Sequence, residues 1–197
     1  MMKFRPCIDI HNGKVKQIVG SSLRDQNDWA AENYVAEQDA FFFAKLYKEL
    51  GLTGGHIIML NPASSPYYEE TKRQAVKALN TYPGGMQIGG GINAENAEEF
   101  LQAGASHVIV TSYVFRGGQI RWEQISYENL EKLRKVVGAE RLVLDLSCKK
   151  RGDLYYIVTD RWQKFTEVPV TLETLRELGG YCSEYLVHAV DAEGKAR

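Results

Sequence analysis

The sequence has little of what marks secreted, membrane or metal-binding proteins. Cysteine occurs only three times in 197 residues, as Cys7, Cys148 and Cys182, without a CxxC pair or a Cys/His cluster at metal-ligand spacing. We therefore predict neither a disulfide framework nor a metal site. No apolar run approaches the roughly 18 to 20 residues that cross a bilayer, and the N-terminus lacks the apolar middle of a signal peptide. These absences favour a cytoplasmic protein with no membrane partner.

An excess of charge of one sign is also absent. Lys and Arg number 24 against 25 Asp and Glu, which gives a net charge of -1. Because non-specific binding of nucleic acid needs a basic field, we predict no nucleic-acid partner. The 44% hydrophobic and 25% charged residues are typical of a folded protein, and no Pro-rich linker or low-complexity segment divides the chain. We expect one domain over residues 1–197.

What the sequence does contain is an alternation of strand-like and helical segments, which is typical of a parallel α/β fold. Several predicted strands are continuous apolar runs, as expected for strands covered on both faces. The six predicted strands are 5–10, 56–60, 86–88, 107–111, 141–146 and 184–188.

Five helices are predicted between and around these strands. One ends before Gly51 and has an apolar face formed by Phe43, Tyr47 and Leu50. Three others begin at residues whose side chains can cap a helix, namely Asn93, Ser126 and Thr171.

Two connections are unusually long. They cover 14–34, after the first strand, and 148–168, after the fifth. Long loops in a compact domain are usually lids or binding loops. Both follow the C-terminal end of a strand, where α/β proteins place their sites, so we expect functional loops.

A strand that runs into three glycines is the strongest local motif, Gln87 to Asn93. Glycines let the backbone approach an anion, and free N–H groups at a helix start can bind it. Gly90 and Gly91 therefore belong either to a phosphate site or to a tight turn. Thr111 and Ser112, at the end of the next strand, would lie beside them and favour one shared phosphate site.

Two acidic residues stand in or at the end of apolar strands, Asp9 and Asp145. An acid in such a place costs desolvation energy and is tolerated when it is hydrogen-bonded, paired or functional. Either residue alone could be a structural aspartate that holds a loop amide. Together, on opposite strands of a barrel, they favour a general acid and base.

Four further residues are secondary candidates. His11 and His188 lie near strand ends, and we expect a structural or hydrogen-bonding role for them rather than proton transfer. Trp162 either stacks on a planar ligand or packs its loop down. Cys148 follows Asp145 by three positions with no evident base nearby, so we treat it as a small buried or loop residue.

In combination these motifs resemble the histidine-biosynthetic isomerase family, in its eukaryotic-type form. The matching segments run in order along nearly the whole chain: Cys7 to Gln17, Gln87 to Asn93, Val110 to Ser112, Val143 to Cys148 and His188 to Gly194. The resemblance implies a (β/α)8 TIM barrel that acts without a cofactor on a ribotide with two phosphates. The reaction is an Amadori rearrangement of phosphoribosylformimino-aminoimidazole carboxamide ribotide (ProFAR) to its aminoketose isomer.

The resemblance also implies residue roles. Asp9 matches the family's proton acceptor and Asp145 its proton donor. One phosphate site is matched by Gly90, Gly91, Thr111 and Ser112, and a loop tryptophan over the aminoimidazole by Trp162. At the sixth strand this chain has His188-Ala189 where many bacterial members of the family carry a Thr. It has Glu193-Gly194 where Asp-Gly is common.

The family continues for two further strands that carry its second phosphate site. About 200 residues compare with roughly 250 for a complete barrel, so we expect six of eight units and a truncated chain. The loss of the second phosphate site would remove binding energy that positions the substrate, which leaves the activity of such a chain open. The complete fold is expected to be a monomer, whereas open edges of a partial barrel would favour self-association. Two alternatives are the cyclase subunit of imidazole glycerol phosphate synthase and a non-catalytic phosphate-binding partial barrel.

Overall fold

Six parallel strands lie side by side, in chain order, at the centre of the described part of the molecule. The computed structural model describes residues 2–18, 32–116, 124–160 and 162–192. All six predicted strands are confirmed to within two residues at each end: β1 (Cys7–His11), β4 (Gly55–Met59), β5 (Met86–Gly89), β6 (Val108–Val110), β7 (Leu142–Asp145) and β11 (Glu184–Leu186). This confirms an α/β fold with a mostly parallel sheet.

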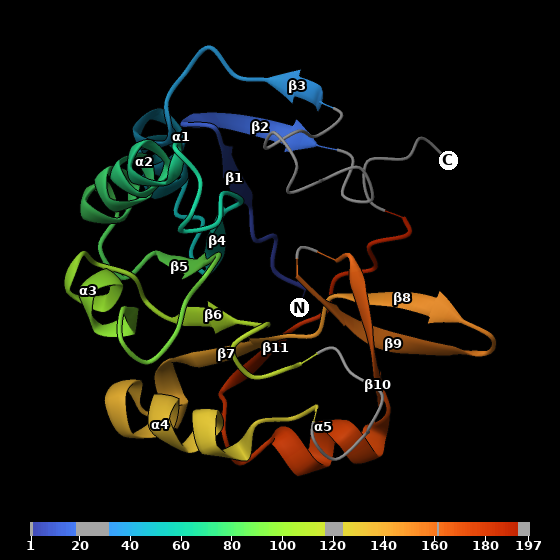
Figure 1. Cartoon of the computed structure of the whole chain (residues 1–197). Coiled ribbons are helices and arrows are strands. Elements are labelled where there is room, and N and C mark those ends of the chain that lie inside the picture. The colour runs from blue at the N-terminus through green and yellow to red at the C-terminus, as the bar shows by residue number, and fades with distance from the viewer. Residues whose placement is uncertain (1, 19–31, 117–123, 161, 193–197) are drawn as a thin grey trace.

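Helices cover the outer face of this curved sheet (Figure 1). They are α1 (Ala40–Glu49), α2 (Tyr68–Thr81), α3 (Ala97–Gln102), α4 (Tyr127–Val137) and α5 (Leu172–Leu178). The outward side chains of the strands, such as Ile8, Ile57, Ile88 and Leu144, join Leu79, Phe100 and Leu130 of the helices in one buried core. The strands' other side chains face inward and are available to form a site. None of the described helices is long and apolar enough to cross a membrane.

The predicted caps explain where two of these helices begin. The side chains of Ser126 and Thr171 accept hydrogen bonds from the backbone N–H groups of Asn129 and Thr174. Asn93 also caps, as predicted, although the regular part of its helix begins three residues later than the cap implies. Its Oδ1 accepts from the N–H groups of Glu95 and Asn96, and its carbonyl oxygen accepts from the N–H of Ala97, where α3 begins.

The first predicted long loop contains strands instead, which corrects the prediction for 14–34. Asn12 and Gly13 both have positive φ, at 52° and 69°, and form a two-residue turn between β1 and β2 (Lys14–Ile18). The antiparallel partner of β2 is β3 (Glu32–Val35), while residues 19–31 lie outside the described part of the chain. The Asn-Gly pair was the sequence signal for this hairpin.

The second predicted loop is also a sheet. β8 (Cys148–Arg151), β9 (Leu154–Thr159) and β10 (Lys164–Pro169) form a three-stranded antiparallel sheet. A two-residue turn, Gly152-Asp153, joins its first two strands. This small sheet projects from the C-terminal end of β7 (Figure 1), so the predicted location beside a strand end is right although the loop conformation is not.

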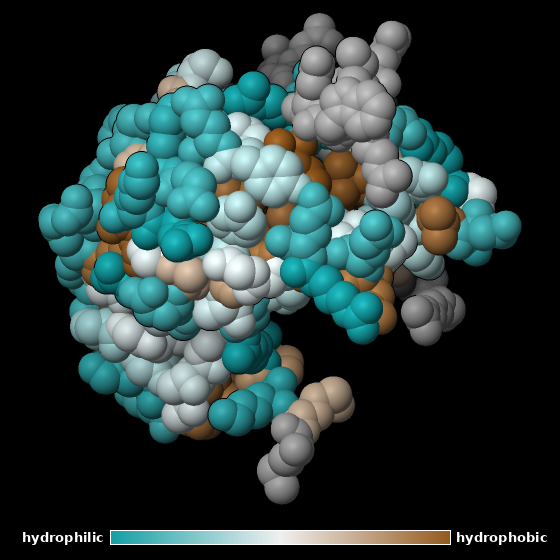
Figure 2. Space-filling model, turned by 90° about the horizontal axis from the view of Figure 1, so that it is seen from below, coloured by the Kyte–Doolittle hydropathy of each residue, from teal (hydrophilic) through white to brown (hydrophobic). Residues whose placement is uncertain are grey.

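The two outer strands of the parallel run come close together at their N-terminal ends. Arg5, just before β1, forms an ion pair with Glu184 of β11, and the side-chain amide of Gln87 donates to the same carboxylate over 3.2 Å. At the start of β1 the Tyr47 hydroxyl of α1 lies 3.5 Å from the carbonyl oxygen of Cys7. Figure 2, in which the molecule is seen from below, shows a notch in the outline of the molecule.

Candidate functional site

Two neighbouring cavities lie at the inner face and C-terminal ends of the parallel strands. One, of about 290 Å³, is bordered by the turns after β4 and β5, the end of β6 and the end of β9. The other, of about 640 Å³, reaches between β1, β2 and the segment after β11. Ile58, Asp145 and Trp162 line both, so the two cavities form one continuous candidate site.

The larger cavity brings together the two predicted acids. Asp9 lies on β1 and Asp145 ends β7, with β4, β5 and β6 between them in the sheet. The thiol of Cys7 lies 2.9 Å from Oδ1 of Asp9. A ligand in this cavity would have one carboxyl group on each side, which is the arrangement that an acid and base pair needs.

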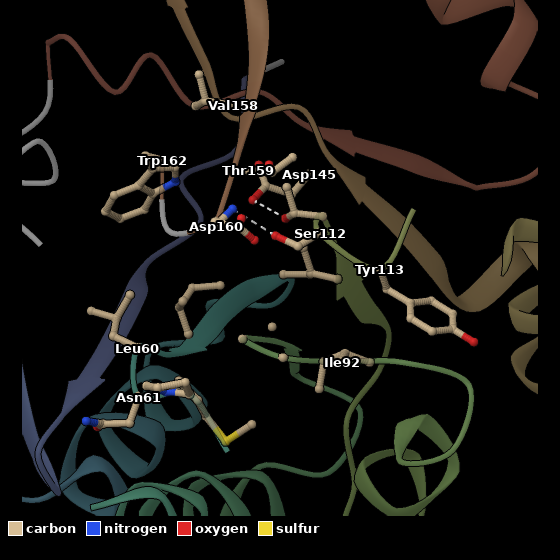
Figure 3. Close-up of a pocket in the computed structure, with 18 residues that line it drawn as sticks. Leu60, Asn61, Ile92, Ser112, Tyr113, Asp145, Val158, Thr159, Asp160 and Trp162 are labelled. Atoms are coloured by element: carbon tan, nitrogen blue, oxygen red, sulfur yellow. Dashed lines mark hydrogen bonds between the residues drawn. The ribbon is translucent and has the colours of Figure 1, made fainter. Parts of the chain in front are cut away.

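Asp145 is held by donors at both carboxylate oxygens. Oδ1 accepts from the backbone N–H and the hydroxyl of Ser147, each at 2.7 Å, and Oδ2 accepts from the Thr111 hydroxyl at 2.7 Å. These bonds fix the orientation of the carboxyl group in the cavity wall, where Figure 3 shows Asp145. Ser147 was missed from the sequence, although an Asp-x-Ser step at a strand end is a pattern in which the aspartate accepts from the chain two residues on.

Thr111 and Ser112 both lie in the smaller cavity, but their hydroxyls have different partners. The hydrogen of Thr111 is directed to Asp145 rather than toward the glycine turn. Ser112 Oγ accepts from the backbone N–H of Asp160 over 3.0 Å, so its own hydrogen is still available to a ligand. Thr111 and Ser112 thus line the same cavity as the glycine turn, while the Thr111 hydroxyl bonds Asp145. The shared phosphate site stays a prediction.

The glycine turn approaches the strand beside it very closely. A Cβ on Gly90, whose φ is +99°, would lie 2.0 Å from the carbonyl oxygen of Met59. Gly91 also has positive φ but opens onto free space, and both line the smaller cavity. The turn is thus both a tight βα connection and a cavity wall, so the two readings of the motif do not exclude each other.

The expected supply of free N–H groups at the following helix is wrong. The N–H of Asn93 donates to Asn96, and those of Glu95 and Asn96 donate to Asn93. Among the described residues around the smaller cavity there is no Lys or Arg. An anion there would depend on the backbone of the glycine turn and on the Ser112 hydroxyl.

Trp162 lines both cavities. Figure 3 shows it among the residues around the smaller one. Its backbone has a φ of +65°, a conformation that is unfavourable for a residue with a bulky side chain. The Lys149 ammonium group donates to the Trp162 carbonyl oxygen over 2.8 Å, and the indole contacts the ring of His188 at a centroid distance of 5.1 Å. The predicted tryptophan is therefore at the site, held by contacts to its backbone and side chain.

The secondary candidates separate into three groups. His188 lines the larger cavity, whereas His11 is buried and lines neither cavity. Glu193 lies outside the described residues. Cys148 is buried, as expected, and this burial raises the pKa of its thiol, which argues against a nucleophilic role.

Lys16 of β2 is a site residue that the sequence reasoning missed. Its largely buried side chain lines the larger cavity together with Asp9 and forms an ion pair with Glu32. It was missed because β2 was read as part of a loop. Within the described ranges no three His, Cys, Asp or Glu side chains are grouped so that they could hold a metal ion.

The sequence matches the family model described as Histidine biosynthesis protein over residues 3–197. The chain belongs to this family. Its relatives in the family include proteins of Medicago truncatula, Neurospora crassa and Saccharomyces cerevisiae, which are 50%, 41% and 40% identical to it. Each alignment covers 98% of this chain, and each relative's name contains the words imidazole-4-carboxamide isomerase. The family resemblance predicted from the motifs is thereby confirmed, and so is its eukaryotic-type form.

The histidine-biosynthesis relatives are longer than this chain. It spans 60% of the length of the Medicago protein, 72% of the Neurospora protein and 70% of the Saccharomyces protein. The name of the Medicago relative also contains the word chloroplastic. A mostly parallel α/β sheet agrees with the TIM-barrel fold of the histidine-biosynthesis family.

Proposed function

We propose that the protein is an intramolecular aldose-ketose isomerase that converts ProFAR to its aminoketose isomer in L-histidine biosynthesis. The observation that carries this proposal is the pair of carboxyl groups of Asp9 and Asp145 on opposite sides of one cavity, in a member of this family. The rearrangement requires proton transfers at the ring oxygen and at C2, which are both bonded to C1 of the ribose, and two carboxyl groups supply them without a metal.

In the proposed reaction Asp145 is the acid and Asp9 the base. Asp145 protonates the ring oxygen of the aminoaldose ribose, which opens the ring to a Schiff base. Asp9 then removes the C2 proton to give an enaminol, which becomes the aminoketose. The fixed orientation of Asp145 supports this assignment, because proton transfer requires the acid to be held within hydrogen-bond reach of its target atom.

The substrate has two phosphates, and we propose that one of them binds at the smaller cavity. The backbone of Gly90 and Gly91 and the available hydrogen of Ser112 support this role. Trp162 would stack on the aminoimidazole at the junction of the cavities. The six parallel strands are proposed to be six of the eight units of the family's barrel, which agrees with the fraction of the relatives' length that the chain spans.

Turnover of the ribotide tests the proposal directly. The purified protein should convert ProFAR without ammonia, and Asp9→Asn or Asp145→Asn should each lower kcat by about a hundredfold or more. Both variants should still bind inorganic phosphate, because neither removes the glycine turn or Ser112. Asp153→Asn, in the turn between β8 and β9, is the matched control and should leave kcat unchanged.

Other outcomes point to the alternatives. Turnover of the isomerised product only when ammonia is added would replace the isomerase with the cyclase. Phosphate binding without any turnover would favour the non-catalytic partial barrel. Sedimentation of the same sample distinguishes the monomer expected for the complete fold from the self-association favoured by the open edges of a partial barrel. Imaging of the tagged protein in its host cell tests the cytoplasmic location.

A further inference from the structure

A continuous chain of side chains connects the two most distinctive residues of the site. Asp145 ends β7 and Trp162 follows β9, so the two come from different sheets. Between them stand Ser147, which bonds Asp145, and His188, which contacts both Ser147 and the indole. The following inference rests on the proposed function and concerns what these two intermediate residues do in it.

The direction of the hydrogen bonds follows from the chemistry of Ser147. Its hydroxyl has one hydrogen to donate, and a carboxylate is a stronger acceptor than an imidazole nitrogen. The hydrogen therefore goes to Asp145, 2.7 Å away, and Ser147 Oγ accepts from Nδ1 of His188, 3.2 Å away. Ser147 is 1% exposed, so its hydroxyl is shielded from solvent, whereas His188 is half-buried.

The imidazole ring of His188 also contacts the indole ring of Trp162. The two rings are at 72° to each other with centroids 5.1 Å apart, an edge-to-face contact. Lys149, from the strand that follows Ser147, holds the backbone of Trp162 through its carbonyl oxygen. A ligand that stacks on the indole of Trp162 would therefore affect the position of His188, which contacts the indole. His188 is in turn connected to Asp145 through the hydroxyl of Ser147.

We propose that Ser147 and His188 are positioning residues that couple the orientation of the Asp145 carboxyl group to the placing of Trp162 against the substrate. When the indole of Trp162 is stacked on the substrate, the Asp145 carboxyl group is then oriented toward the ring oxygen that it protonates. Neither residue exchanges a proton with the substrate in this role. Their loss should lower the rate of the chemical step and leave the contacts that bind the phosphates intact.

Two pairs of variants test this role. Ser147→Ala removes the hydroxyl and Ser147→Thr keeps it; His188→Leu removes the donor and His188→Asn keeps an N–H near the position of Nδ1. We expect Ser147→Ala and His188→Leu each to lower kcat about tenfold or more with less than about a twofold change in KM. The two conservative variants should recover most of the loss.

The double variant Ser147→Ala with His188→Leu distinguishes coupling from two separate effects. If the residues act through one chain of contacts, the double variant should be no slower than the slower single variant. Multiplied losses, a loss seen mainly in KM, or a His188→Asn variant as slow as His188→Leu would overturn the inference. If Ser147→Ala does not fold, as judged by its thermal transition, the two His188 variants still test the inference. A kcat that is recovered in His188→Asn relative to His188→Leu supports it.

Failure of this inference differs from failure of the proposed function. An active unmodified protein whose kcat is unaffected by Ser147→Ala and His188→Leu overturns the positioning role alone. An unmodified protein that does not turn over ProFAR overturns the proposed function, and the positioning role with it.

Discussion

At the scale of single residues, two independent features of the surroundings of Gly90 exclude a side chain. Its φ is +99°, and a Cβ would meet the Met59 carbonyl oxygen at 2.0 Å. We expect Gly90→Ala to lower the free energy of unfolding by about 3 kcal/mol or more. Gly91→Ala is the control, since it has the unfavourable φ without the clash, and should cost about 1 kcal/mol. Urea denaturation of both variants measures the difference, and equal losses would contradict the argument from packing.

The chemistry of the site was predictable from the sequence as far as it depends on residue type. An acid in an apolar strand is unusual, so Asp9 and Asp145 could be selected and placed at one cavity. The partners of these acids depend on side-chain directions across neighbouring strands, which no local pattern contains. For this reason Thr111 was assigned to phosphate, whereas its hydroxyl bonds Asp145, and Ser147 was not selected.

Among the elements, α1 depends on a residue with two functions. Asp39 caps the helix by accepting from the N–H of Phe42, and it pairs with Lys77 of α2 at 2.9 Å. The hydrogen bond from Lys77 lowers the pKa of Asp39, against the opposing effect of partial burial. The charged form is therefore favoured in the folded state. Its contribution to stability is complete above the ordinary aspartate pKa of about 3.9 and is lost as the pH falls through the lowered folded pKa.

Two substitutions separate these functions of Asp39. Asp39→Asn keeps a capping side chain and removes the charge, so it should cost less than about 1 kcal/mol at neutral pH, because the ion pair is partly exposed to solvent. This cost should be smaller at about pH 3 than at neutral pH, and it is lost completely only below the lowered folded pKa. Asp39→Ala also removes the cap and should cost about 1 kcal/mol more at either pH. Urea denaturation at about pH 7 and about pH 3 measures the loss in the free energy of unfolding for each variant. A loss in Asp39→Asn that does not change with pH would refute the link between the charge of Asp39 and stability.

The elements that the sequence predicted best are those with a repeated local signal. The parallel strands are apolar runs bounded by turns, and Ser126 and Thr171 are good helix caps. The hairpins after β1 and β7 are harder to predict, because segments of their length between a strand and a helix are typical of long loops. Asn12-Gly13 and Gly152-Asp153 each occupy a two-residue turn between paired strands, which was the available evidence against a loop.

At the scale of the whole molecule, long-range contacts determine how far the sheet curves. Consecutive parallel strands are neighbours, so their order follows from the chain itself. The approach of the first strand to the last cannot be derived from the chain order, because it depends on the accumulated twist of six strands. In the described residues this approach is marked by Arg5 and Glu184, which are 179 positions apart in the sequence.

The Arg5–Glu184 ion pair therefore gives a test of the curvature itself. Glu184→Gln keeps the shape of the side chain and an oxygen for Gln87, but removes the charge that attracts Arg5. Because both side chains are partly exposed, the loss of stability should be about 0.5 to 1 kcal/mol and should shrink in about 1 M salt. Amide exchange should become faster at the start of β1, far along the chain from the substitution. The control Glu128→Gln breaks an ion pair with Lys132 within α4, so its effect on exchange should stay in that helix. Unchanged exchange at β1 in Glu184→Gln would mean that backbone pairing and core packing alone hold the ends of the sheet together.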